Sequence, residues 1–436
     1  MGAVSPAGWS VAALRNALAR GEPLPTQFIE RPYSQTEPSS IIHHPSSHSA
    51  QPTSHRSINP SIHQSAHHPS SIIHHPSSSI PHLSRTLPQS YRARVVPPPA
   101  ERPAFLSHPR LRRASPLTQF AAAAALEAGA CVPSNARRGL IVCLQSGPVQ
   151  YVSRFMEEIL KDPAVASPLV FPETVFAAPA SHVAAVFGDD SLSYTLLGDP
   201  ASFLQGVALA TQWLDAHRLD ACLVVGAEEI NWIHAEALWH FQREAIASAG
   251  AGALCLTHNP DLSIGIELEA ITDAHMYSNS CSMAEAARNM RAQLQMEPQA
   301  NPSRSSGLGS VRPRRLPDSA LNQSPSESGA TSATPYTGAT PSSTLLCDGL
   351  GGTLRSGAAE KAAWADWAGP RISPKQILGE GLMAAAAWQC VAACDALTNE
   401  GFASAIVSLV GCDQQAIGAR FGKAAAVGQN SRNLEP

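Results

Sequence analysis

Residues 193–214, SYTLLGDPASFLQGVALATQWL, form a predicted strand–turn–helix junction of the kind that carries a nucleophile in many enzymes. A thiol or hydroxyl at such a helix start is activated by free backbone N–H groups and by the helix dipole. The tip of this turn is Asp199-Pro200-Ala201, and none of these side chains can attack a carbonyl carbon. As a helix start the residues fit well, because aspartate is a good N-cap and proline is favoured at the first helical position. The sequence thus predicts the architecture of a nucleophile site without its nucleophile.

The cysteines and histidines show no metal-ligand spacing. The nine cysteines are scattered through apolar runs without a Cys-x-x-Cys pair, so we expect no zinc site and no disulfide framework. Cys390 and Cys394 are one helical turn apart, and we interpret them as small core residues because free cysteine is among the most buried residue types. We interpret His182 as a structural histidine. No cofactor and no metal ion is predicted.

The composition excludes several classes of protein. The chain has 436 residues and a net charge of −4, without a basic stripe that could neutralise nucleic-acid phosphates. No apolar run approaches the ~20 residues that span a bilayer, and no signal peptide is visible. These features predict a cytoplasmic protein that has neither a nucleic acid nor a membrane as its partner.

Two tracts interrupt the globular pattern. The first, from about residue 34, is rich in Ser, His, Pro and Ile, and it contains the nonapeptide SSIIHHPSS twice. Ten of the 17 histidines lie there, without cysteine or acidic partners at fixed spacing, so we predict a disordered insertion rather than a metal site. The second tract, 298–343, is predicted to be a disordered linker by the same argument.

The remaining sequence alternates between apolar strands and Ala-rich helices. Predicted strands include RGLIVCLQSG (138–147), DACLVVGAEE (220–229) and SAIVSLVGCD (404–413), and predicted helices include SPLTQFAAAAALEAGA (115–130) and LMAAAAWQCVAACDALT (382–398). SHVAAVFG (181–188) is consistent with either a helix or an extended segment. Uninterrupted apolar strands between such helices indicate a largely parallel sheet that is covered on both faces.

Several segments, in the correct order, resemble the β-ketoacyl synthase (condensing enzyme) family. They are MGAVSPAGWSVAALRNALARGEPLP (1–25), SPLVFPETVFAAPASHVAAVFG (167–188), DACLVVGAEE, AGAGALCLT (249–257), CDGLGGT (347–353), SPKQILGEG (373–381) and SLVGCDQQA (408–416). The resemblance implies an α/β fold of the thiolase-like type, layered αβαβα, with two pseudo-equivalent lobes and two disordered insertions. The chain starts inside the opening turn of the family, so either its start is assigned too late or an edge of the core sheet is missing.

The resemblance also implies a chemistry in which the thiol of a cysteine takes an acyl group from acyl carrier protein. Two histidines promote decarboxylation of a malonyl extender by donating hydrogen bonds to its thioester oxygen. Aligned on these motifs, the cysteine position holds Pro200 and the two histidine positions hold Asp348 and Glu380. Lys375 keeps the family's lysine, and Gly411 is all that remains of a Gly-Phe-Gly-Gly loop. The Cys/His/His set is therefore absent.

Three alternative roles for the substituting residues stay open. Ser202 could act as a hydroxyl nucleophile, although it lacks an obvious base and also fits an ordinary first-turn hydroxyl. Asp348 and Glu380 could form an acid/base pair in which repulsion raises one pKa, or could reflect drift after catalysis was lost. Lys375 could form an ion pair with Glu380 and simply hold its loop.

These inferences divide the chain into segments. The N-terminal lobe comprises its start at 1–33, the insertion at 34–91 and its main part at 92–260; the C-terminal lobe comprises its start at 261–297, the linker at 298–343, its main part at 344–425 and a tail at 426–436.

The resemblance favours a protein of fatty-acid or polyketide-type biosynthesis that lacks condensing activity. Chain-length-factor subunits have the fold without the cysteine, so we expect a heterodimer with an active ketosynthase, or a homodimer, that docks acyl carrier protein. The alternatives are an active acyltransferase with rewired residues and a degenerate paralogue without function.

Overall fold

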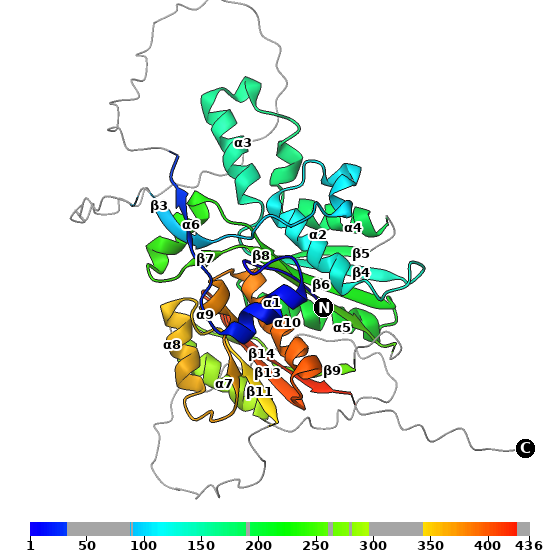
Figure 1. Ribbon diagram of the computed structural model, residues 1–436, viewed down its shortest axis with the longest axis vertical. Coiled ribbons are helices and arrows are strands. Elements are labelled where there is room, and N and C mark those ends of the chain that lie inside the picture. Colours follow the sequence, from blue (N-terminus) through cyan, green and yellow to red (C-terminus); the bar gives the residue numbers. More distant parts are fainter. Residues whose placement is uncertain are drawn as a thin grey trace, which may run out of the picture. The chain divides into compact units, whose positions relative to one another are not determined.

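A computed structural model describes residues 1–32, 88, 90–188, 192–259, 265–278, 281–295 and 343–424 (Figure 1). The described residues of 1–29 and 90–424 belong to one large compact unit. Nearly all of the predicted insertion at 34–91, nearly all of the predicted linker at 298–343 and the whole tail at 426–436 lie outside the described residues.

The first sheet of the large unit has five strands in the order β1-β8-β6-β4-β5. They are β1 (Gly2–Val4), β8 (Gly250–Thr257), β6 (Ala221–Glu228), β4 (Arg138–Leu144) and β5 (Leu192–Leu197). β4 is parallel to β5 and β6, whereas β8 is antiparallel to β6 and β1. At one edge of this sheet lies β1, a strand of three residues.

The second sheet has six strands. The order β10-β14-β13-β11-β12 comprises β10 (His275–Met276), β14 (Gln415–Lys423), β13 (Ser404–Val410), β11 (Thr344–Cys347) and β12 (Arg371–Ile372), and β9 (Ile266–Ile271) also pairs with β14. β11 is parallel to β12 and β13. Each sheet therefore has a parallel core with antiparallel strands at its side.

Helices form three layers around the two sheets (Figure 1). Between the sheets lie α5 (Ser202–Asp215) and α10 (Met383–Asn399), which contact strands of both. The outer face of the first sheet is covered by α2 (Pro116–Ala128) and α4 (Ala178–Phe187), and that of the second by α7 (Met283–Gln295) and α8 (Leu354–Ala363). This arrangement confirms the predicted αβαβα layering, and α4 shows that the ambiguous segment SHVAAVFG is helical.

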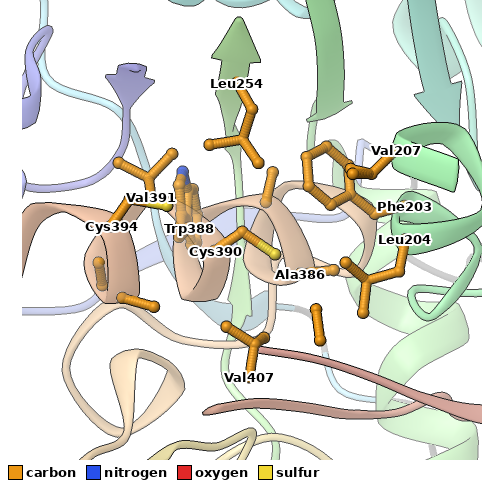
Figure 2. Packing of buried hydrophobic residues seen from close by; sticks show 14 of the residues in the cluster. Phe203, Leu204, Val207, Leu254, Ala386, Trp388, Cys390, Val391, Cys394 and Val407 are labelled. Atoms are coloured by element: carbon orange, nitrogen blue, oxygen red, sulfur yellow. The ribbon is translucent and has the colours of Figure 1, made fainter. Parts of the chain in front are cut away.

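The centre of the core is α10, in which every residue from Met383 to Leu397 is buried. A helix that is apolar all round requires neighbours on every side. Figure 2 shows side chains of α5 (Phe203, Leu204, Val207) and of strands β8 and β13 (Leu254, Val407) gathered around it. Glycine on the strands permits the close approach, because a Cβ on Gly226 would lie 2.6 Å from the Met383 carbonyl oxygen.

The remaining elements are small. A three-stranded sheet has the order β2-β3-β7, with β2 (Gln27–Glu30), β3 (Ser90–Arg94) and β7 (Ala247–Ser248). The other helices are α1 (Val11–Arg20), α3 (Val149–Lys161), α6 (Trp232–Phe241) and α9 (Pro374–Leu378), and short 3₁₀ turns lie at Ala104–Ser107, Pro109–Leu111, Pro163–Val165 and Phe171–Thr174. Among the described helices, none has the length and apolar character needed to cross a membrane.

Candidate functional site

The Gly198-Asp199-Pro200 turn lies where β5 ends and the chain enters α5. Helix α5 begins at Ser202, two residues later than the predicted cap implied, with Ala201 as its N-cap. The turn closes with 3₁₀-type bonds, in which the N–H groups of Ser202 and Phe203 donate to the carbonyl oxygens of Asp199 and Pro200. Pro200 is buried at this junction and brings no nucleophilic group to it.

The Asp199 carboxylate connects this turn to the turn between β13 and β14. It accepts hydrogen bonds from the backbone N–H groups of Gln414 (3.1 Å) and Gln415 (3.3 Å) and from the Gln415 side-chain amide (3.3 Å). Burial raises the pKa of Asp199, and these hydrogen bonds oppose the shift. A Cβ on Gly411 would lie 1.9 Å from Asp199 Oδ2, so glycine is required there. Asp199 therefore links the two lobes rather than acting as a simple helix cap.

Ser202 is buried and its hydroxyl is engaged. Its Oγ accepts a hydrogen bond of 2.9 Å from the Gln415 amide, and Gln205 donates in turn to the Gln415 Oε1 atom at 3.1 Å. Among the described residues, no histidine or carboxylate forms a hydrogen bond with the Ser202 hydroxyl. The arrangement lacks the general base that a serine nucleophile requires.

Asp348, at the end of β11, is fully buried and bonded within its own lobe. It accepts hydrogen bonds from the Ser373 hydroxyl at 2.6 Å and the Leu350 N–H at 3.1 Å, and it lies 3.1 Å from Arg371. Burial raises the pKa of Asp348, and the bond from Ser373 opposes this most strongly.

Lys375 and Glu380 form the predicted ion pair. The Lys375 Nζ atom lies 2.9 Å from Glu380 Oε2, and both side chains are almost completely buried, at 4% and 1% exposure. Burial lowers the pKa of Lys375, but the charge of Glu380 and its hydrogen bond raise it by more, so the net shift is upward. Glu380 Oε1 accepts from the N–H of Leu382, a residue held at φ +47°. The pair therefore fixes a strained loop ahead of α10.

The two acids do not form the carboxylate pair considered from the sequence. Within the described part of the chain, no hydrogen bond joins Asp348 to Glu380, and each has its own cation. A third acid, Glu360 on α8, joins this region unforeseen: it is buried, accepts from the Gly349 N–H at 2.9 Å, and has a pKa raised by burial to about 8. Its place in an Ala-rich helical segment gave no signal of this role.

Glu228 and Glu229, at the end of β6, accept hydrogen bonds from the loop after β4 and from the first turns of two helices. Glu228 accepts from the N–H groups of Gln145 (2.6 Å) and Ser146, just beyond β4. Glu229 accepts from Leu117 (3.1 Å) and Gln150 (2.7 Å), in the first turns of α2 and α3. One carboxylate thus serves two helix N-termini, which favour negative charge. Burial nevertheless raises the pKa of Glu228 to about 8 and that of Glu229 to about 7.

These shifts predict that the protein loses stability as the pH rises from 6.5 to 8. A carboxyl group whose pKa is higher in the folded state than in the unfolded state stabilises the fold fully below its unfolded value, and that contribution disappears as the pH passes the folded value. Glu360, whose pKa burial also raises to about 8, contributes in the same direction. We expect the free energy of unfolding to fall by about 2 kcal/mol per pH unit in urea titrations. His234, with a pKa lowered by burial to about 4, changes stability below this window. In Glu229→Gln the free energy of unfolding should fall less steeply with pH. A free energy of unfolding that rises with pH in the native chain would contradict the raised pKa values of these carboxyl groups.

The thiols and histidines supply no alternative catalytic set in the described chain. All nine cysteines are free, and Cys390 and Cys394 lie in the core around α10, as expected (Figure 2). Cys412 is in the turn that Asp199 holds, but burial raises its pKa to about 12, so it is a neutral thiol at pH 7. His182 bonds to Glu173 at 2.9 Å. No group of three or more described His, Cys, Asp or Glu residues is placed to hold a metal ion.

Comparison of the structure with solved proteins defines the class of fold. The chain is similar to the ishigamide ketosynthase/chain length factor (13% identity, 97% of this chain and 98% of that one, TM-score 0.61). It is also similar to the type II PKS acyl-carrier protein–ketosynthase complex AntDE:AntF bound to the hexaketide (12%, 97% and 97%, 0.60). A third similar structure is the ketosynthase ApeO in complex with its chain length factor ApeC from Xenorhabdus doucetiae (11%, 97% and 96%, 0.58). The chain therefore has the thiolase-like fold of the ketosynthases.

The sequence comparisons add nothing to this likeness. No protein-family profile matches the chain, and no curated protein matches it. The structural likeness covers nearly the whole chain, and the three solved structures above are assemblies of ketosynthases with chain length factors or acyl carrier protein.

Proposed function

We propose that this chain is a ketosynthase-fold subunit without condensing activity that pairs with an active ketosynthase in fatty-acid or polyketide-type biosynthesis. One observation carries the proposal: where the resemblance expects a cysteine and two histidines, the chain holds Pro200, Asp348 and Glu380, and both acids are bonded within the chain. The scaffold around them is intact. Such a subunit would contribute shape and docking surface rather than reacting groups.

The edge of the first sheet supports a protein partner. Strand β5 is its last strand among the described residues, and its Leu192, Tyr194 and Leu197 side chains are exposed by 44–49%. Eight further large apolar side chains are exposed between residues 152 and 176, on α3 and the loop after it. Exposed apolar side chains and an unpaired strand edge are typical of interaction sites. We propose that β5 pairs with the corresponding edge strand of a ketosynthase.

Replacing Tyr194 by lysine is expected to abolish co-purification with that ketosynthase. Lysine at a strand edge opposes pairing, and its charge would have to be desolvated in an apolar interface. The measurement is affinity co-purification of the co-expressed pair, followed by size-exclusion chromatography. Leu354→Lys on α8 is the matched control, since Leu354 is 58% exposed on the other lobe. A native chain that stays a monomer or homodimer beside the ketosynthase would contradict the heterodimer.

Incubation with an acyl-carrier-protein thioester is expected to leave the mass of the chain unchanged. The buried Ser202 hydroxyl has no base, and Pro200 offers no nucleophile. Intact-mass analysis, with a cysteine-bearing ketosynthase as the positive control, makes the measurement. An acyl adduct that peptide mapping places on Ser202 would instead support the rewired acyltransferase.

Two further parts of the proposal concern the setting of the protein. Nine free cysteines support a reducing, cytoplasmic location. Docking of acyl carrier protein to the pair is proposed from the fold, and binding of labelled carrier protein to the co-purified heterodimer tests it. A degenerate, non-functional paralogue would be expected to lack a cooperative melting transition.

A further inference from the structure

Three buried acids and two cations lie around the loop that follows β11. They are Asp348, Glu360, Glu380, Arg371 and Lys375, which we call the second-lobe cluster. Arg371 pairs with Asp348 at 3.1 Å, and Lys375 pairs with Glu380 at 2.9 Å. Glu360, although only 1% exposed, forms no ion pair with any described residue. With all five groups ionised, the cluster would hold one negative charge without a counter-charge, and an unpaired buried charge is costly.

The hydrogen bonds around Glu360 also leave buried oxygen atoms without a donor. Glu360 Oε2 accepts from the Gly349 N–H at 2.9 Å, but Glu360 Oε1 has no hydrogen-bond partner among the described residues. Gln389 on α10 donates to the Ser408 carbonyl oxygen at 3.0 Å, whereas its own Oε1 atom is buried without a partner. A Cβ on Gly349 would lie 3.0 Å from Glu360 Oε2 and 3.6 Å from Gln389 Oε1, so both side chains reach the same point of the loop. Buried acceptors nearly always have a donor, and an ionised Glu360 supplies none.

We propose that Glu360 carries a proton in the folded protein at pH 7, and that this proton holds the loop at 348–353 in place. The proton removes the uncompensated charge and turns Oε1 into a donor for a neighbouring buried oxygen such as that of Gln389. The neutral acid still accepts the Gly349 N–H through Oε2. Ionisation of Glu360 leaves a buried, unpaired carboxylate, which is relieved when the loop opens and admits water. The proposal goes beyond the partner role and does not depend on it, because it concerns contacts within this chain alone.

The electrostatic surroundings of Glu360 agree with this geometry. The pKa of Glu360 is raised to about 8, first by burial and then by the charge of Asp348. The Ser408 hydroxyl, the Lys375 charge and the Gly349 N–H favour the ionised form but do not outweigh these effects. Because the pKa is higher in the folded state than in the unfolded state, the loop is held below about pH 8 and released above it.

Other ionisable side chains on the neighbouring elements do not supply the missing charge. Burial keeps three nearby thiols neutral by raising their pKa values: Cys347, Cys390 and Cys394. On α7, Arg291 is bound to Asp366, and on α10, Asp395 is bound to Arg15. The remaining charged side chains of α7 and α8 are exposed: Glu285, Arg288, Arg355 and Lys361. Within the described part of the chain, a proton on Glu360 is therefore what balances the cluster.

The test is ¹³C NMR of the full chain with carboxyl-labelled glutamate, in the native form and as Glu360→Gln. The signal that Glu360→Gln lacks should have the shift of a neutral acid at pH 7 and titrate with a midpoint at about pH 8. Glu360→Asp removes the same signal and provides the assignment if the glutamine variant does not fold. Glu285→Gln, which removes an exposed acid on α7, is the matched control and should leave this signal unchanged.

Hydrogen exchange at 348–353 measures the loop itself. After correction for the intrinsic effect of pH, exchange in the native chain should be at least about tenfold faster at pH 9 than at pH 7, whereas in Glu360→Gln it should not change. Equal exchange in the two proteins at pH 9 would overturn the role of the proton in holding the loop. A Glu360 signal that is already at the ionised shift at pH 7 would overturn the protonation. A midpoint that moves when sodium replaces potassium at constant ionic strength would show that a bound cation balances the cluster instead.

Discussion

Replacing Lys375 by methionine is expected to lower the free energy of unfolding by about 3–5 kcal/mol, as measured by urea denaturation at pH 7.5. The substitution leaves the Glu380 carboxylate, only 1% exposed, without its cation. Removing one member of a buried ion pair is costly because the remaining charge is neither solvated nor compensated. The loss also affects Leu382, since Glu380 Oε1 holds the N–H of that strained residue.

Two controls distinguish this effect from a general loss of charge. The double variant Lys375→Met/Glu380→Gln should recover most of the stability, because it removes both charges from the core while the amide oxygen of glutamine can still accept from the Leu382 N–H. Arg154→Met breaks an exposed pair with Glu158 and should cost less than about 0.5 kcal/mol. A cost below about 1 kcal/mol for Lys375→Met would mean that the pair is not buried.

Much of the fold could be predicted because its signals are local. The uninterrupted apolar runs of β4 and β6 and the Ala-rich segment of α10 are buried as predicted, since continuous apolar segments require cover on all sides. The ion pair between Lys375 and Glu380 could also be predicted, because the two residues are five positions apart around a glycine loop.

The bonding of the site could not be predicted, because its partners are distant in the sequence. The Gln415 amide bonds to Ser202 across 213 residues, and Asp348 reaches Arg371 across a helix and a loop. The predicted start of α5 at Asp199 was two residues too early for the same reason. Asp199 has the propensity of an N-cap, but its carboxylate accepts hydrogen bonds from three donors of the other lobe. Local capping propensity is a weak preference that tertiary hydrogen bonds override.

Replacing Gly411 by alanine is expected to lower the free energy of unfolding by about 2–4 kcal/mol, because Gly411 lies against Asp199 in the turn between β13 and β14. The new Cβ would lie 1.9 Å from Asp199 Oδ2 and 2.5 Å from its Cγ. Asp199 cannot move aside cheaply, because it is buried and three donors of Gln414 and Gln415 bind it. Asp199→Ala alone should cost a similar amount, since it leaves the N–H group of the buried residue Gln415 and that of Gln414 without their acceptor.

A double-mutant cycle decides whether these residues act as one contact. In the Asp199→Ala background the clash is gone, so Gly411→Ala should cost less than about 1 kcal/mol, and the two losses should be strongly non-additive. Thermal or urea unfolding of the four proteins provides the numbers. The control is Gly357→Ala on α8, where the nearest atom to a new Cβ would be 4.0 Å away, so this substitution should be neutral or slightly stabilising. Gly401→Ala would not serve as a control, because Gly401 has a φ of +83°. If the losses of Gly411→Ala and Asp199→Ala simply add, the two residues do not act as one contact, and the junction at Gly198-Asp199-Pro200 does not join the lobes through Gly411.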